Sequence, residues 1–307
     1  MGTYILRRIL QMIPVILGVT FLIFVMVYGL PGDPTIGRCG ERPCPPAYVE
    51  KFREEHNLDK PLLVQYVLYL GAILHGDLGT TFTGRSVAHE LAIRWPTTIK
   101  LALIAIVIEI VIGITAGVLA GMRRGKFIDS LVTVSTLVLI SIPIFVIGSI
   151  AQLIFGVKLG WFPVTSTSGT VYQLIMPAFV LASISIAYVA RLMRTNLVEN
   201  LRADYVRTAR AKGLSNARTV GVHTMRNSLI PVITYIGVDL GALMGGAIIT
   251  ERIFNVNGVG NFLYRGILTK DGSIVTGTIT MLVLVFLIAN LVVDVLYGVL
   301  DPRISND

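Results

Sequence analysis

Long apolar runs recur through the whole of this 307-residue sequence. They cover approximately residues 9–30, 98–122, 129–155, 172–189, 229–250 and 273–300. A run of roughly 20 apolar residues has the length at which an α-helix crosses a bilayer. Charged residues make up only 14% of the chain, whereas soluble domains carry about 25%. The sequence therefore predicts an all-α membrane protein with six transmembrane helices.

Basic residues gather in the segments between alternate runs. Arg7 and Arg8 precede the first run, a cluster at 123–126 follows the second, and a basic segment at 202–226 follows the fourth. The loop at 158–171 has a single basic residue. Positive charge in short loops marks the cytoplasmic side of a membrane. We therefore expect both termini to be cytoplasmic, with a large extracytoplasmic loop after the first helix. The same rule accounts for the net charge of +8 without a nucleic acid partner.

This pattern predicts three parts along the chain. They are residues 1–30 with the N-terminus and first helix, the loop region 31–97, and a five-helix core at 98–307 containing a cytoplasmic loop at 193–228. In the loop region, helical spacing predicts an amphipathic helix at about 48–74 and a separate short helix at about 87–95. We expect Pro143 to kink the third span, and residues 251–272 to form a loop.

Two sets of glycines recur at a spacing of four within the predicted spans. They are Gly113, Gly117 and Gly121 in the second span, and Gly237, Gly241 and Gly245 in the fifth. Residues four apart share one face of a helix, and small residues let neighbouring helices approach closely. Both sets predict helix-packing faces.

The loop region contains the only cysteines, Cys39 and Cys44. In an oxidising compartment this pair predicts a disulfide. The alternative is two free thiols with no special role. A zinc site has no support, because there is no other cysteine and the first histidine is His56.

Sequence motifs of catalysis are missing. There is no Gly-x4-Gly-Lys-Ser/Thr loop for nucleotide phosphates and no nucleophile elbow of the Gly-x-Ser-x-Gly type. His89-Glu90 is not a zinc motif, because Ile93 stands where the second histidine would be. The four histidines show no metal-ligand spacing, so we expect neither a metal site nor an enzyme.

Three acidic residues lie within or near the spans: Glu109, Asp239 and Asp294. Carboxyl groups in a membrane are costly and often functional. They could pair with an arginine, with an asparagine such as Asn290, or with water in the bundle. They could instead line a polar translocation path, or serve as the ion relay of an ion-coupled transporter.

The basic segment holds six basic residues and one acid, Asp204, between residues 202 and 231. Its first half predicts a short helix ended by Gly213, since glycine readily takes the positive φ of a C-terminal cap. Ser215 or Asn216 can cap a second helix. From charge and length alone, the segment is either a solvated loop or a docking element for a soluble partner.

This segment resembles the cytoplasmic EAA loop of ABC-importer permeases. Arg207-Thr-Ala209, three residues and then Gly213 fit that frame, although the usual glutamate and first alanine are replaced. Arg226 stands where the loop's usual proline would be. Both departures resemble the peptide/nickel branch, with Asp204-Tyr-Val-Arg-Thr-Ala-Arg-Ala-Lys-Gly213, His223, Arg226-Asn227 and Ile230-Pro231.

Further fragments of the same branch follow in order along nearly the whole chain. They include Pro31-Gly-Asp-Pro34, Leu58-Asp-Lys-Pro61, Gly76-Asp-Leu-Gly79, Thr250-Glu-Arg-Ile-Phe254 and Asp301-Pro-Arg303. The short N-terminus and large first loop resemble the B-type permease subunit of dipeptide/oligopeptide transporters. Cys39 and Cys44 are not part of that pattern.

The resemblance implies a type I ABC-importer permease fold in the plasma (inner) membrane. It implies a C-type permease partner, two ATP-binding subunits that hold ATP and Mg, an extracytoplasmic solute-binding protein and a peptide substrate, with no cofactor in this chain. Nickel, glutathione, haem or another solute could replace the peptide. An ion-coupled secondary transporter is a further alternative, separated by co-purification with an ATPase.

The resemblance also implies which residues couple the chain to its ATPase subunits. They are Asp204, Arg207, Ala209, Arg210, Lys212, Gly213, Leu214, Ser215 and His223. A rigid short helix at this position would pass closure of the ATPase dimer to the spans.

Overall fold

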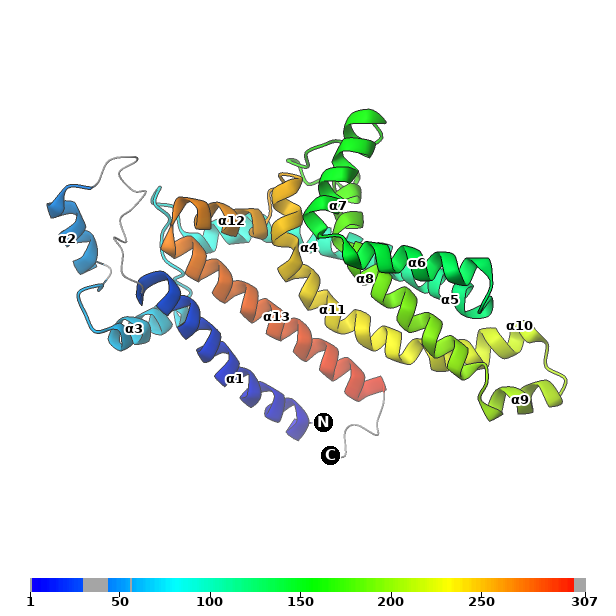
Figure 1. Ribbon diagram of the computed structural model, residues 1–307. Coiled ribbons are helices and arrows are strands. Elements are labelled where there is room, and N and C mark those ends of the chain that lie inside the picture. Colours follow the sequence, from blue (N-terminus) through cyan, green and yellow to red (C-terminus); the bar gives the residue numbers. More distant parts are fainter. Residues whose placement is uncertain (1, 30–43, 56, 301–307) are drawn as a thin grey trace. The chain divides into compact units, whose positions relative to one another are not determined.

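A computed structural model describes residues 2–29, 44–55 and 57–300, and this part of the chain is built from helices (Figure 1). It divides into two compact units, Met1–Thr98 with Asn257–Asp307, and Ile99–Val256. The last helix therefore belongs with the N-terminal part of the chain and not with the predicted core at 98–307.

The first unit pairs the two ends of the chain. It contains α1 (Gly2–Phe24), η1 (Val25–Gly29), α2 (Pro46–Glu55), α3 (Leu62–Leu74), the start of α4 (Val87–Glu109), α12 (Val259–Thr269) and α13 (Gly272–Leu300). α1 packs along α13, and α12 packs against α13. A small apolar core that includes Leu91, Phe262 and Ile274 lies among α4, α12 and α13.

Three expectations for this unit were wrong. The helix expected at 48–74 is split into α2 and α3, because Asn57 takes a positive φ of 55° and Pro61 caps α3. The segment expected as a separate helix at 87–95 is the start of α4, which continues through Pro96. The expected loop at 251–272 contains α12, whose N-terminal cap is Gly258.

The second unit is built around α8 (Val171–Asn200). It also contains the end of α4, η2 (Ile110–Ile114), α5 (Thr115–Met122), α6 (Phe127–Ser141), α7 (Ile144–Ala151), η3 (Gln152–Lys158), α9 (Asp204–Ala211), α10 (Asn216–Arg218), η4 (Thr219–Thr224) and α11 (Met225–Ile253). α5, α6, α7 and α11 all pack on α8. In the most apolar 18-residue stretch of α8, 72% is buried inside the protein. The corresponding share in the other unbroken candidate spans is 33% or less. α8 is therefore the core helix of this unit.

Five helical segments of the described chain are long and apolar enough to cross a membrane, and a bent pair makes a sixth. The pair is α6 with α7–η3, which meet at 105°. We expected a kink at Pro143, but the helix is interrupted there. The residue before a proline is pushed towards extended backbone, and Ile142 has φ −96° and ψ 126°.

Some predicted features lie outside the described residues. They are Pro31-Gly-Asp-Pro34, Asp301-Pro-Arg303 and Cys39. The disulfide between Cys39 and Cys44 therefore stays a prediction.

Candidate functional site

The basic segment folds into two short helices joined by a tight turn. α9 ends at Ala211, and Gly213 follows with φ +80°. The amide of Leu214 donates to the Ala209 carbonyl (3.2 Å), and the amide of Gly213 donates to the Arg210 carbonyl (2.9 Å). These two bonds and the left-handed glycine form a Schellman cap, which satisfies carbonyls at the helix end. Gly213 thus ends α9 as the sequence predicted.

The second helix begins as predicted too. The Ser215 side chain accepts a hydrogen bond from the Arg218 amide at 3.3 Å, so Ser215 is the N-terminal cap of α10. α10 continues without a break into η4 and α11. The turn at Gly213 is therefore followed closely by a helix that is long and apolar enough to cross a membrane.

Most side chains of this segment point to solvent. The exposed residues are Arg202, Asp204, Arg207, Arg210, Lys212, Arg218, His223 and Arg226, while Ala209 and Leu214 are half-buried. Asp204 and Arg207 are 3.9 Å apart with almost fully exposed side chains, so their interaction adds little stability. The result is a basic surface whose charges are available to an acidic partner.

Val206 and Tyr205 hold α9 against the rest of the unit. Val206 is fully buried, and α9 packs against η4. The Tyr205 hydroxyl donates to the Asn200 side chain at the end of α8 (2.8 Å). α9 is therefore held from one face and exposes the opposite face.

An ion pair supports the helix that leads into this segment. Arg194 of α8 donates to both carboxylate oxygens of Asp129 in α6, one of them at 2.8 Å. Asp129 also accepts from the amide of Gly125 (2.8 Å), in the basic turn between α5 and α6. No local pattern in the sequence indicates this pair, because Asp129 opens the third predicted span and Arg194 lies 65 residues away in the predicted loop 193–228.

The first set of four-spaced glycines packs against α8. A Cβ at Gly113 would lie 2.7 Å from Val189, and one at Gly117 would lie 2.5 Å from the Ala190 carbonyl oxygen. At Gly121 it would meet Leu197 at 3.0 Å. A larger side chain would thus push α4–α5 away from α8.

The second set differs from the first. Gly241 is buried and Gly237 is half-buried. A Cβ at Gly245 would meet no described atom within 4 Å. Close helix packing at this set remains a prediction.

The three intramembrane acids have different surroundings. Asp294 in α13 forms an ion pair with Arg8 in α1 at 3.3 Å. Of the alternatives for these acids, Asp294 therefore follows pairing with an arginine. Glu109 and Asp239 lie beside one another in the second unit, and both are buried. Among the described residues there is no cluster of three potential metal ligands.

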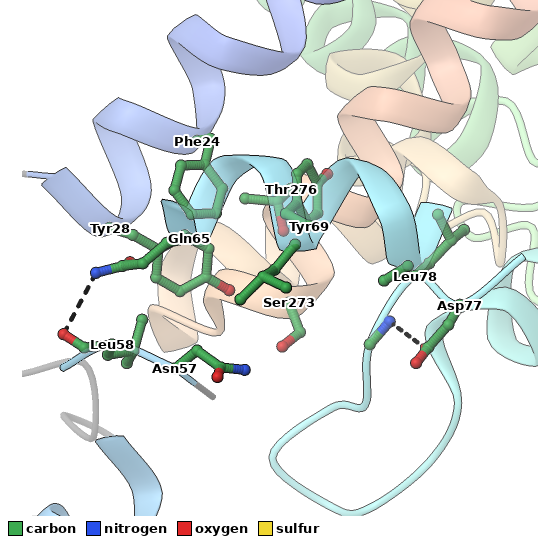
Figure 2. A pocket seen from close by; sticks show the side chains of 13 residues that line it. Phe24, Tyr28, Asn57, Leu58, Gln65, Tyr69, Asp77, Leu78, Ser273 and Thr276 are labelled. Carbon is green, nitrogen blue, oxygen red and sulfur yellow. Dashed lines mark hydrogen bonds between the residues drawn. The ribbon is translucent and has the colours of Figure 1, made fainter. Parts of the chain in front are cut away.

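The first unit contains a cavity of about 260 Å³ (Figure 2). Phe24, Tyr28 and Tyr69 line it together with Asp77 and Ser273. Asp77 accepts from the Gly79 amide (2.8 Å), and burial raises the pKa of the Tyr69 hydroxyl to about 12. Figure 2 shows the Gln65 amide nitrogen directed at the Leu58 carbonyl, to which it donates a hydrogen bond at 3.3 Å. The side-chain oxygen of this amide, Gln65 Oε1, is buried and has no hydrogen-bond partner among the described residues.

Two family models together cover most of the chain. The one described as "Binding-protein-dependent transport system inner membrane component" matches residues 113–306. The one described as "Binding-prot-dependent transport system membrane comp, N-term" matches residues 1–102.

Curated relatives are similar over their full length. The di/tripeptide transport system permease protein DppB of Pseudomonas aeruginosa is 39% identical over an aligned length of 334 residues. The alignment covers 100% of this chain and 99% of the relative. A putative peptide transport system permease protein of Brucella abortus is 39% identical over 315 residues, 100% of both chains. The dipeptide transport system permease protein DppB of Escherichia coli K12 is 35% identical over 334 residues, 99% of this chain and 98% of the relative.

Proposed function

The chain belongs to the family of inner-membrane components of binding-protein-dependent transport systems, and on that premise we propose that it is a permease subunit of an ATP-driven peptide importer. As a multi-pass component of the inner membrane, it forms half of the path through which the cargo crosses. The relatives named as peptide permeases at 34–39% identity support a peptide cargo.

The observation that carries the mechanism is the capped helix α9. It is short, and its exposed face carries Arg207 and Arg210, with Lys212 directly after its end. Val206 packs it onto the unit, and Gly213 joins it to α10–α11. Such an element suits a groove on a soluble ATPase subunit. When the ATPase dimer closes on ATP, α9 moves with its groove, and α8 and α11 move with α9. The two states of the permease are thereby linked to the two states of the motor.

The proposed function requires several partner subunits. Two ATP-binding subunits hold ATP and Mg, and the chain itself binds no nucleotide. A C-type permease subunit forms the other half of the path, and an extracytoplasmic solute-binding protein delivers the peptide. The ends of the chain and α9 lie on the cytoplasmic side, and the region between α1 and α4 lies on the extracytoplasmic side.

Uptake tests the cargo. Cells that lack the gene are complemented with the wild-type chain, and uptake of labelled di- and oligopeptides is compared with uptake of nickel, glutathione and haem. We expect peptide uptake that depends on ATP. Uptake of another of these solutes in place of peptides would reject the peptide cargo.

Co-purification tests the transporter class. The tagged chain should retain ATPase subunits after extraction in mild detergent. Peptide uptake that persists without ATP and follows an ion gradient would instead identify an ion-coupled secondary transporter.

A further inference from the structure

Two carboxyl groups face each other inside the membrane-spanning part of the second unit. Glu109 is the last residue of α4 and is fully buried, and Asp239 in α11 is 9% exposed. The two carboxyl groups interact directly. Even so, both oxygens of Glu109 and Oδ2 of Asp239 have no partner in good hydrogen-bond geometry among the described residues. Apart from the contact between the two carboxyl groups, three buried oxygens of the pair receive no hydrogen bond from another described residue.

The groups around the pair are neutral. From α8, the Ser185 hydroxyl interacts with Asp239 and with the Tyr235 hydroxyl of α11. No lysine, arginine or histidine is among the described groups that interact with either carboxyl. Arg194 on α8 is engaged by Asp129. A buried carboxylate needs a cation or several donors, and the neighbouring groups described here are the hydroxyls of Ser185 and Tyr235.

The backbone holds Glu109 in place. The π-helical segment η2 begins at Ile110, directly after Glu109, and such bulges recur at functional sites. Gly113 within η2 fits closely against Val189 of α8. The buried carboxyl group of Glu109 is thus positioned by a packed backbone element.

Aromatic rings connect the pair to the surface of the unit. Tyr235 interacts with both carboxyl groups, and its ring centroid lies 6.1 Å from that of Tyr188. Tyr188 is 47% exposed. Aromatic faces attract cations electrostatically, so these tyrosines suit the approach of a positive group.

We propose that Glu109 and Asp239 form a subsite for a primary ammonium group, and that its source is the amino terminus of the peptide in transit. An ammonium group has three N–H donors and one positive charge, which matches the three buried oxygens and the missing cation. The choice of cargo rests on the proposed function. A free inorganic cation has the same charge, so the test separates the two sources.

Binding is measured on the purified transporter complex in lipid nanodiscs, without the solute-binding protein, so that recognition by that protein does not enter. The probes are labelled alanyl-alanine and its N-acetyl form. We expect the wild type to bind the free peptide about tenfold more tightly or better, because a charged hydrogen-bonded group is lost on acetylation. Glu109→Gln and Asp239→Asn should weaken binding of the free peptide to the level of the acetylated one.

Asp294→Asn is the matched control, because it removes an intramembrane carboxylate that already has Arg8 as its partner. It should leave the affinity ratio of the two peptides unchanged. Thermal unfolding of each complex shows that the variants are assembled, and Asp239→Asn gives a second test if Glu109→Gln does not assemble.

Three results would overturn the proposal. The first is equal loss of both peptides in Glu109→Gln, which indicates a structural role. The second is no change with either peptide. The third is equal affinity of the wild type for both peptides, together with a rise in the thermal stability of the complex in potassium or ammonium chloride. If Glu109→Gln abolishes that rise, the pair binds an inorganic cation.

Uptake by the wild type with its solute-binding protein is measured in parallel. If no peptide is taken up, the proposed function fails. If peptide is taken up and the affinities do not follow the amino terminus, only the subsite fails.

Discussion

Asp129 in α6 accepts hydrogen bonds from two nitrogen atoms of Arg194 in α8, and it also fixes the turn between α5 and α6 through the Gly125 amide. The side chain of Asp129 is 7% exposed. A bidentate pair in this setting is stronger than an exposed ion pair. It therefore joins α6 to α8 through two residues that are 65 positions apart in sequence.

Replacing either partner of this pair should destabilise the chain. We expect Asp129→Ala and Arg194→Ala each to cost about 2–4 kcal/mol, and the double variant to cost clearly less than their sum, because the second removal leaves no unpaired charge. Equilibrium unfolding of the purified chain in mixed micelles measures the cycle. Strictly additive losses would show that the two residues act independently.

Gly213→Val should uncouple ATP hydrolysis from uptake while expression is maintained. A Cβ at Gly213 meets no neighbour within 4 Å, so the cost comes from its φ of +80°, roughly 1–2 kcal/mol for a side chain other than glycine. That strain distorts the turn between α9 and α10. We expect peptide uptake to fall about fivefold or more.

Two controls accompany Gly213→Val. Gly213→Asn should keep most of the uptake, because asparagine tolerates the left-handed conformation. Gly160→Val carries the same kind of strain at φ +62° in another segment, also without neighbours, and should leave coupling intact. Wild-type uptake by Gly213→Val would remove the coupling role from this turn.

Gly117→Ala should destabilise the second unit. Its Cβ would lie 2.5 Å from the Ala190 carbonyl oxygen and 2.6 Å from the Met193 Cβ, and overpacking of this kind costs about 1–3 kcal/mol. Gly245→Ala, where a Cβ meets nothing described, should be neutral or slightly stabilising. Unfolding of the purified chain in micelles compares the two, and equal effects would contradict close packing at Gly117.

Val206→Ala should loosen α9. The lost burial costs about 1–3 kcal/mol, and α9 has no other fully buried side chain in the described structure. Amide hydrogen exchange in α9 should accelerate. Val222→Ala removes the same atoms from a valine that is 56% exposed, and it should leave exchange in α9 unchanged. Similar exchange in both variants would mean that Val206 does not anchor the helix.

Features that depend on neighbouring residues in the chain were predictable from sequence. The apolar runs placed the spans, because length and hydropathy alone decide whether a helix suits a bilayer. Gly213 marked the end of α9 and Ser215 the start of α10, because a helix cap depends on residues that are adjacent in sequence. The frame Arg207-Thr-Ala209 with Gly213 indicated the family that full-length relatives support.

Features that depend on tertiary contacts were not predictable in the same way. Apolar spacing does not show that α6 and α7 meet at 105°, since the angle depends on how each half packs. The separate short helix predicted at 87–95 is continuous with the second span in α4, because Pro96 does not interrupt that helix. The neighbours Glu109 and Asp239 are 130 residues apart (239 − 109), and nothing local to either one indicates the other.

The pairing of α1 with α13 has a consequence for biosynthesis. The second unit is one continuous stretch, Ile99–Val256, and all its helices have emerged before α13 is made. The first unit joins the earliest helix to the last one, with Arg8 and Asp294 in contact. During translation α1 therefore waits in the bilayer without its partner while the whole second unit is inserted. The first unit can therefore complete its packing only after α13 is made, later than all the helices of the second unit.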